Sequence, residues 1–90
     1  MIHQLKLREA FAEPVLYGEK NFEVRYNCDR GFQKGDRVTF YVVDNNMCHL
    51  EHPVEEKEYE ITYVLSGVGL RPEYVVFGIR EVPENEHFEY

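Results

Sequence analysis

The amino-acid sequence predicts an α+β domain in which one early helix accompanies a mixed or closed β-sheet. Segments that alternate between apolar and polar residues, as half-buried strands do, recur at regular intervals along most of the chain. Apolar residues at helical spacing occur in one early segment. No internal repeat or interdomain linker divides the 90 residues, so a single domain with one core is expected.

The first predicted strand covers residues 2–7, where His3, Leu5 and Leu7 alternate with polar residues. Both leucines are expected to point into the core. Because His3 shares their face, the simplest expectation for it is a buried histidine that is hydrogen-bonded.

A short helix is predicted over residues 9–17, where apolar residues such as Phe11 and Val15 recur at helical spacing. Gly18 favours a stop there, since glycine adopts the left-handed backbone that ends many helices. Pro14 lacks an N–H and crowds the preceding turn. The helix is therefore expected either to kink at Pro14 or to begin late.

The second strand is predicted to begin near residue 21 and to alternate through residue 25. Phe22 and Val24 share one face, which is expected to be buried, whereas Glu23 and Arg25 share the other. Two interpretations of the charged face are open: a solvated edge carrying a structural ion pair, or one wall of a polar cleft.

Three further strands are predicted over residues 37–43, 55–65 and 74–82. The second of these has a largely charged face opposite an apolar one, to which we assign Tyr59, Ile61, Tyr63 and Leu65. The last is apolar almost throughout, which is typical of a central strand. We expect the domain to comprise residues 1–82, followed by an acidic tail over residues 83–90.

The formal net charge of −7 argues against indiscriminate binding to nucleic acid, because phosphate contacts require lysine and arginine. The charge is unevenly distributed, however. Residues 1–37 carry seven Lys and Arg against six Asp and Glu, whereas residues 38–90 carry three against eleven. The basic residues therefore gather in the part of the chain that contains the second strand.

No apolar run of signal-peptide or membrane-spanning length is present, so we expect a cytoplasmic protein without a membrane partner. Cys28 and Cys48 are expected to be free thiols in that compartment. The segment from Cys48 to His52 contains metal-ligand residue types, but it lacks a second ligand pair at standard spacing. No metal is therefore expected, and the lack of any dinucleotide or P-loop motif predicts no cofactor.

Several motifs resemble the ASCH domains, a branch of the PUA-like superfamily. The central one is the pattern G-x-K-x-x-E-x-R, formed by Gly18, Lys20, Glu23 and Arg25. The others follow in the family's order: His3-x-Leu5-Lys6, Gly35-Asp36, Thr62 to Ser66, and Tyr74 to Ile79. The resemblance implies a PUA-like β-barrel of about five strands, with one helix between the first two and a cleft suited to RNA or a modified base.

The resemblance also implies the site residues. A ligand is expected to be contacted by His3, Lys6, Lys20, Glu23, Arg25, Asn27 and Arg30. Arginine offers a planar fork of donors to a phosphate or a base edge, while a carboxylate accepts from an exocyclic amine. Cys28 interrupts an Asn-Asp-Arg run that is contiguous in the ASCH pattern, which affects the expected positions of Asp29 and Arg30. Three aromatic residues are candidates for stacking on bases: Tyr26, Phe32 and Tyr41.

The function expected from this resemblance is binding of RNA or a modified nucleotide. The alternative is an amidohydrolase acting on acetylated cytidine, since one ASCH branch performs that reaction with a lysine that aligns with Lys20. Glu23 occupies the position of that branch's threonine, so catalysis would instead need Glu23 to act as a general base on water. A protein-interaction domain that uses its acidic face is the second alternative.

Overall fold

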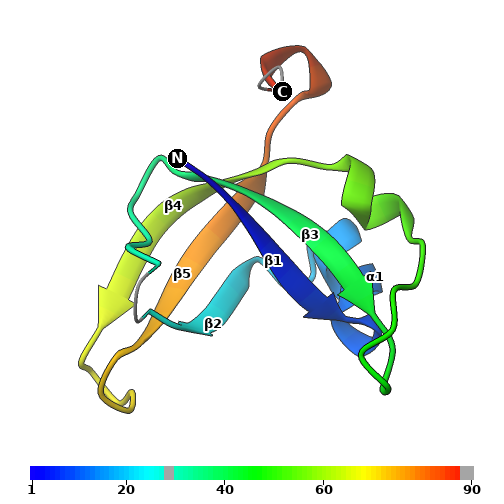
Figure 1. Cartoon of the computed structure of the whole chain (residues 1–90). Coiled ribbons are helices and arrows are strands. Elements are labelled where there is room, and N and C mark those ends of the chain that lie inside the picture. The colour runs from blue at the N-terminus through cyan, green and yellow to red at the C-terminus, as the bar shows by residue number, and fades with distance from the viewer. Residues whose placement is uncertain (28–29, 88–90) are drawn as a thin grey trace.

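The computed structural model describes residues 1–27 and 30–87 (Figure 1). The strands are β1 (Ile2–Arg8), β2 (Phe22–Tyr26), β3 (Arg37–Val43), β4 (Tyr59–Ser66) and β5 (Tyr74–Glu81), and the helix α1 (Glu9–Leu16) lies between β1 and β2. Two short 3-10 helices, η1 (Pro53–Glu56) and η2 (Glu84–Glu86), precede β4 and follow β5. The predicted α+β class and the position of the helix are confirmed.

The five strands form one mixed sheet in the order β1-β3-β4-β5-β2. Strand β1 pairs parallel to β3, and the other neighbours pair antiparallel. As its apolar sequence predicted, β5 is central, between β4 and β2. Figure 1 shows a strongly curved sheet. Strands β1 and β2 are its two edges and share no backbone ladder in the described residues, so the sheet is not closed.

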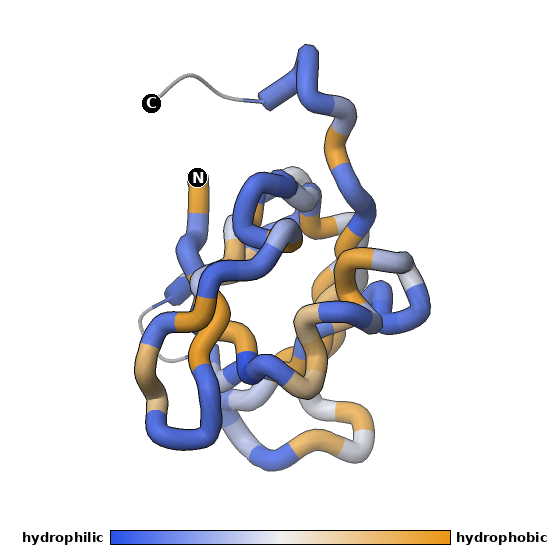
Figure 2. Tube along the Cα trace, turned by 90° about the vertical axis from the view of Figure 1, so that its right-hand side faces the viewer, coloured by the Kyte–Doolittle hydropathy of each residue, from blue (hydrophilic) through white to orange (hydrophobic). Residues whose placement is uncertain are grey.

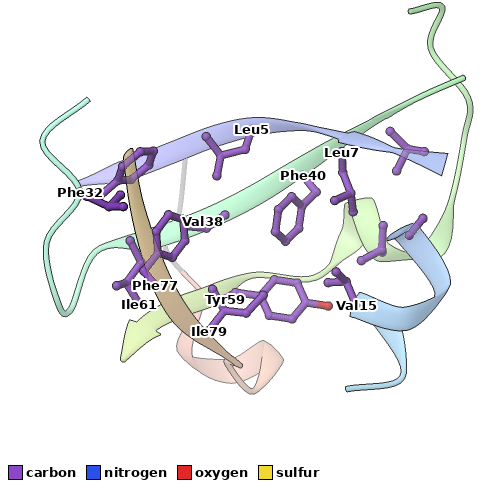
Figure 3. Close-up of a cluster of buried hydrophobic side chains, with 14 residues drawn as sticks. Leu5, Leu7, Val15, Phe32, Val38, Phe40, Tyr59, Ile61, Phe77 and Ile79 are labelled. Atoms are coloured by element: carbon purple, nitrogen blue, oxygen red, sulfur yellow. The ribbon is translucent and has the colours of Figure 1, made fainter. Parts of the chain in front are cut away.

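The core lies on the concave side of the sheet, and Figure 3 shows its main side chains. The alternation predicted for β1 is confirmed, because Leu5 and Leu7 are buried and His3 is buried beside them. Strand β3 contributes Val38, Phe40 and Val42 on the same principle. Apolar side chains from four strands (β1, β3, β4 and β5), from α1 and from η1 thus surround one interior. Figure 2 shows the matching change between hydrophobic and hydrophilic segments along the trace.

Helix α1 begins at Glu9 immediately after β1 and contains Pro14, so the predicted late start is wrong. A proline at this position removes one main-chain bond near the end of a short helix, where fewer bonds depend on it. Ala12 and Val15 are the buried residues of the helix, whereas Phe11 remains 44% exposed. The helix packs against β1, β3 and η1, and this leaves Phe11 at the surface.

The 3-10 helix η1 replaces the beginning of the strand predicted over residues 55–65. A ring nitrogen of His52 accepts a hydrogen bond from the Val54 N–H at 3.1 Å, which caps this turn and stops the chain from extending. Glu58 then turns inward and is only 1% exposed, although the sequence predicted a solvated acidic face. Its carboxylate accepts from Nη1 of Arg37 at 3.1 Å, which compensates the buried charge.

Strand β4 does not keep its apolar residues on one face, so that prediction is wrong. Tyr59 and Ile61 are buried, but the register shifts between Ile61 and Tyr63. This irregularity adds one residue to β4, so the side chains after it point to the opposite face from the one that strict alternation predicts. As a result, Tyr63 and Leu65 lie on the outer face, 64% and 37% exposed.

We expect Gly78→Ala to destabilise the fold by about 1 kcal/mol or more, because added atoms in a packed region force neighbours to move. A Cβ at this position would lie only 2.5 Å from Oγ1 of Thr62, the residue at the register shift. Urea unfolding measures the loss. In a Thr62→Ala background the same change should be much less harmful, and equal losses in both backgrounds would contradict the steric explanation.

The end of the chain is held to the domain at least as far as residue 87. A ring nitrogen of His87 bonds the carbonyl of Val82 at 2.9 Å, and Nη1 of Arg37 lies 3.4 Å from the carbonyl of Glu86. Only the last part of the predicted tail, residues 88–90, lies outside the described residues.

Candidate functional site

Strand β2 faces the opposite way from the sequence prediction. Glu23 is 2% exposed, whereas Phe22 and Val24 are 45% and 51% exposed. The cause is the register with β5, in which Glu23 lies opposite the buried Phe77 and Val24 opposite Val76. Since paired residues share a face, this register sends Glu23 inward and the apolar residues of β2 outward. The expectation that Phe22 and Val24 are buried is therefore wrong.

The buried Glu23 is held by two cations. Its Oε1 accepts from Nε and Nη2 of Arg25 at 3.0 and 2.7 Å, and its Oε2 accepts from Nζ of Lys20. Lys20 also donates to the carbonyl of Phe22 at 2.8 Å. Burial of a carboxylate is tolerated only when such partners replace water. The cluster leaves one excess positive charge close to the surface.

Arg25 also links the two edges of the sheet. Its Nη2 donates to the backbone carbonyl of Lys6 in β1 at 2.8 Å, across the opening between β1 and β2. A hollow of about 460 Å³ lies at this opening; we call it the seam cleft, and its walls are Lys6, Leu7, Arg8, Phe11, Lys20, Phe22, Glu23, Val24 and Arg25. This volume falls within the range of roughly 300–1,000 Å³ typical of small-ligand sites.

Two phenyl rings flank the lysine of the seam cleft. Nζ of Lys20 lies 5.3 Å from the ring centre of Phe11 and 5.1 Å from that of Phe22. Each ring is nearly half exposed, so a planar group in the cleft has an aromatic surface to stack on. Phe11 was not among the predicted site residues, because its helical spacing indicated a packing role.

A second hollow lies on the other side of the Arg25 bridge, and its volume is about 670 Å³. Its walls are Gln4, Leu5, Lys6, Arg25, Arg30, Tyr41 and Met47. Nη1 of Arg30 lies 3.4 Å from the carbonyl of Gln4, which brings this predicted site residue close to β1. Lys6 and Arg25 line both hollows, so basic side chains follow the whole opening between the edge strands.

Residues 2–79 match the family model described as "Domain of unknown function (DUF3850)". The chain belongs to the DUF3850 family. No curated protein matches the sequence. In the described part of this DUF3850 domain, no helix is long and apolar enough to cross a membrane.

Two of the predicted site residues of the DUF3850 domain, His3 and Asn27, contact other parts of the fold and do not line either hollow. The ring of His3 is buried against Phe32, 4.7 Å between centres, and its Nε2 lies 2.8 Å from Oδ2 of Asp36. Asn27 accepts from the N–H of Phe32 at 3.1 Å through Oδ1. Neither lines the seam cleft or the second hollow. The simplest expectation for His3, a buried and hydrogen-bonded ring, is confirmed.

We expect Asp36 to stabilise the folded domain near neutral pH and to lose this stabilising effect in acid. Burial alone would raise the pKa of Asp36, but hydrogen bonds from His3 and Gln33 and the nearby N-terminal ammonium bring it below its usual 3.8. A lowered pKa contributes stability above the unfolded-state value, and that stability is lost as pH falls through the folded-state value. Urea unfolding should therefore show the advantage of the wild type over Asp36→Asn shrinking between about pH 5 and pH 3. A constant difference would contradict the pairing.

The histidines near Cys48 also have structural partners. Nε2 of His49 lies 2.9 Å from Oε2 of Glu55, while His52 caps η1. Burial tends to raise the pKa of Glu55, but bonds from the Val42 N–H and from His49 lower it overall. Cys48 is an exposed free thiol, and no group of three possible metal ligands occurs within residues 1–27 and 30–87. The predictions for Cys28 and Asp29 lie outside the described residues.

The three aromatic residues considered for stacking have different positions. Phe32 is a core residue, 4.8 Å from Phe77 between ring centres. Tyr26 lies on the outer face, where its hydroxyl donates to Glu73 at 2.7 Å. Of the three, only Tyr41 lines a hollow of the site, and its ring stacks on that of His49 with 4.4 Å between the ring centres.

Proposed function

We propose that this DUF3850 domain is a small ASCH-like member of the PUA-like superfamily that binds RNA or a nucleotide-like ligand at the opening between β1 and β2. The fold supports the relationship, since five strands with a helix between the first two are what the resemblance implies. We interpret the strongly curved sheet as an open form of the PUA-like barrel that the resemblance implies.

The observation that carries the proposal is the Lys20–Glu23–Arg25 cluster. Three residues of the G-x-K-x-x-E-x-R motif meet at the opening between β1 and β2, where Arg25 reaches the backbone of β1. A simple ion pair for stability would not need two cations, a bridge to β1 and two exposed phenyl rings. Lysine and arginine suit a phosphate, and Phe11 and Phe22 suit the face of a base.

The amidohydrolase alternative is less well supported by the same contacts. Both oxygens of Glu23 already accept from cationic donors, so a water activated by this carboxylate would compete with Lys20 or Arg25. Incubating the wild type and Lys20→Ala with N4-acetylcytidine separates the two functions. Turnover that is lost in Lys20→Ala would favour the enzyme.

The proposal is tested by titrating a short single-stranded RNA and nucleoside monophosphates into the protein at increasing salt. We expect affinity to fall as salt rises, with a shallow slope, because the chain has a net charge of −7 and the two hollows offer few cations. Among the described residues these cations are Lys6, Arg8, Lys20, Arg25 and Arg30. A steep slope would indicate a larger basic surface than this site offers. Absence of binding at low salt would contradict the proposal.

A further inference from the structure

The outer face of β2, β5 and β4 carries an apolar stripe that the proposed function does not use as a whole. It results from the reversed orientation of β2 and from the register shift in β4, and its members are Phe22, Val24, Tyr26, Tyr63, Leu65, Tyr74 and Val76. Six of these side chains are between 37% and 64% exposed, and Val76 is half-buried between them. Helix α1 packs against β1, β3 and η1, so it does not cover this stripe.

The size of the stripe matches the centre of a protein interface. A complete aromatic side chain offers about 150–250 Å², so the exposed parts of these residues present roughly 500 Å². This is comparable to the largest apolar patch of a typical monomer, roughly 300–600 Å², which is often a functional surface. Each partner contributes roughly 800 Å² to a standard interface, in which an apolar centre is surrounded by a polar rim, so the stripe would form the centre.

Charge argues for a protein partner over a nucleic acid. The stripe contains no lysine or arginine between its ends, whereas phosphate binding would require them. One end carries Arg80, paired with Glu60 at 2.7 Å, and the other carries Glu73, bonded to the Tyr26 hydroxyl. One end of the stripe therefore carries an ion pair whose arginine side chain is 52% exposed, and the other end carries an exposed glutamate.

We infer that the stripe is the interface of a homodimer. A two-fold axis that lies between the two facing sheets and runs perpendicular to the strands reverses the strand direction in the second copy. It therefore places Arg80 over Glu73 of the partner subunit, and the reverse pair forms by symmetry. An axis parallel to the strands would instead place the two arginines together. Because each chain carries a net charge of −7, repulsion opposes association at low salt, and screening should strengthen the dimer.

Sedimentation equilibrium of the full chain over a range of protein concentrations tests this inference. We expect a reversible dimer that becomes tighter as salt rises. Tyr63→Glu should raise the dimer Kd by about tenfold or more, because it places two like charges in the apolar stripe. Tyr17→Glu is the matched control, since Tyr17 is 69% exposed beside α1, and it should leave the Kd unchanged.

A charge exchange tests the orientation. Arg80→Glu and Glu73→Arg should each weaken the dimer, and the double variant should recover most of the affinity. If the single variants weakened the dimer by unfolding the chain, the double variant would show no such recovery. A monomer at all concentrations, or a dimer indifferent to Tyr63→Glu, would overturn the inference. So would a short RNA whose binding to monomeric protein is abolished by Tyr63→Glu. Phe22 and Val24 belong to both the stripe and the seam cleft, but the substituted residues Tyr63, Glu73 and Arg80 do not line the cleft, so the two proposals can fail separately.

Discussion

Glu23→Gln is expected to lower the free energy of unfolding by about 3 kcal/mol or more, as breaking a buried ion pair usually does. The glutamine keeps the shape of the side chain but leaves Lys20 and Arg25, whose side chains are only 18% and 24% exposed, without their anion. Reversible urea unfolding followed by circular dichroism measures this loss directly.

Glu60→Gln provides the matched control for that measurement. Glu60 pairs with Arg80 at 2.7 Å, but its side chain is 27% exposed, against 3% for Glu23, and the side chain of Arg80 is 52% exposed. Solvent screens such a pair, so its loss should lower stability by less than about 1 kcal/mol. Equal effects of the two substitutions would mean that Glu23 is not the buried centre of a charge cluster.

Arg25→Ala is expected to weaken binding of a nucleotide-like ligand by about 1–3 kcal/mol. The change removes a forked donor shared by both hollows, and it also removes the link from β2 to the carbonyl of Lys6. Isothermal titration with a nucleoside monophosphate or a short RNA measures the effect, once circular dichroism has shown that the variant is folded.

Two further variants make the Arg25 result specific. Arg25→Lys keeps the charge but loses the fork, so its affinity should lie between those of the wild type and Arg25→Ala. Glu56→Ala removes an exposed charge from η1, and because Glu56 lines neither hollow it should change binding little. Similar losses in Arg25→Ala and Glu56→Ala would indicate a general charge effect.

The elements with one clearly apolar face were predictable from the sequence. Strand β1 buries Leu5 and Leu7, the residues that its alternation assigned to the core, because its other face is polar. Strand β3 was predicted over residues 37–43, which are its observed bounds. The helix between β1 and β2 was likewise predicted, within one residue of its observed end.

The orientation of β2 was not predictable from alternation, since a period of two identifies which residues share a face but not which face is inside. Hydrophobicity favoured burial of Phe22 and Val24. The structure buries Glu23 instead, which depends on partners at Lys20 and Arg25 and on pairing with β5. The G-x-K-x-x-E-x-R motif contained that information, because it groups the three residues that meet.

The register shift in β4 had an equally weak sequence signal. One extra residue near Thr62 reverses the alternation of β4. The residues around it, Ile61 to Val64, have the composition of an uninterrupted strand, so the sequence does not indicate the shift. The nearest hint is Gly78 on the neighbouring strand, where only a hydrogen leaves space for the threonine side chain. Both the outer stripe and the exposed aromatic walls of the cleft follow from such pairings between distant segments.

The most direct test of the proposed site is a map of amide chemical shifts during titration with a nucleoside monophosphate. We expect the largest changes along the opening between β1 and β2, at residues 6–8 and 20–25, with smaller changes near Arg30 and Tyr41. Changes concentrated at Tyr63, Leu65 and Tyr74 on the outer face, or none at millimolar ligand, would contradict a nucleotide-binding role for the Lys20–Glu23–Arg25 cluster.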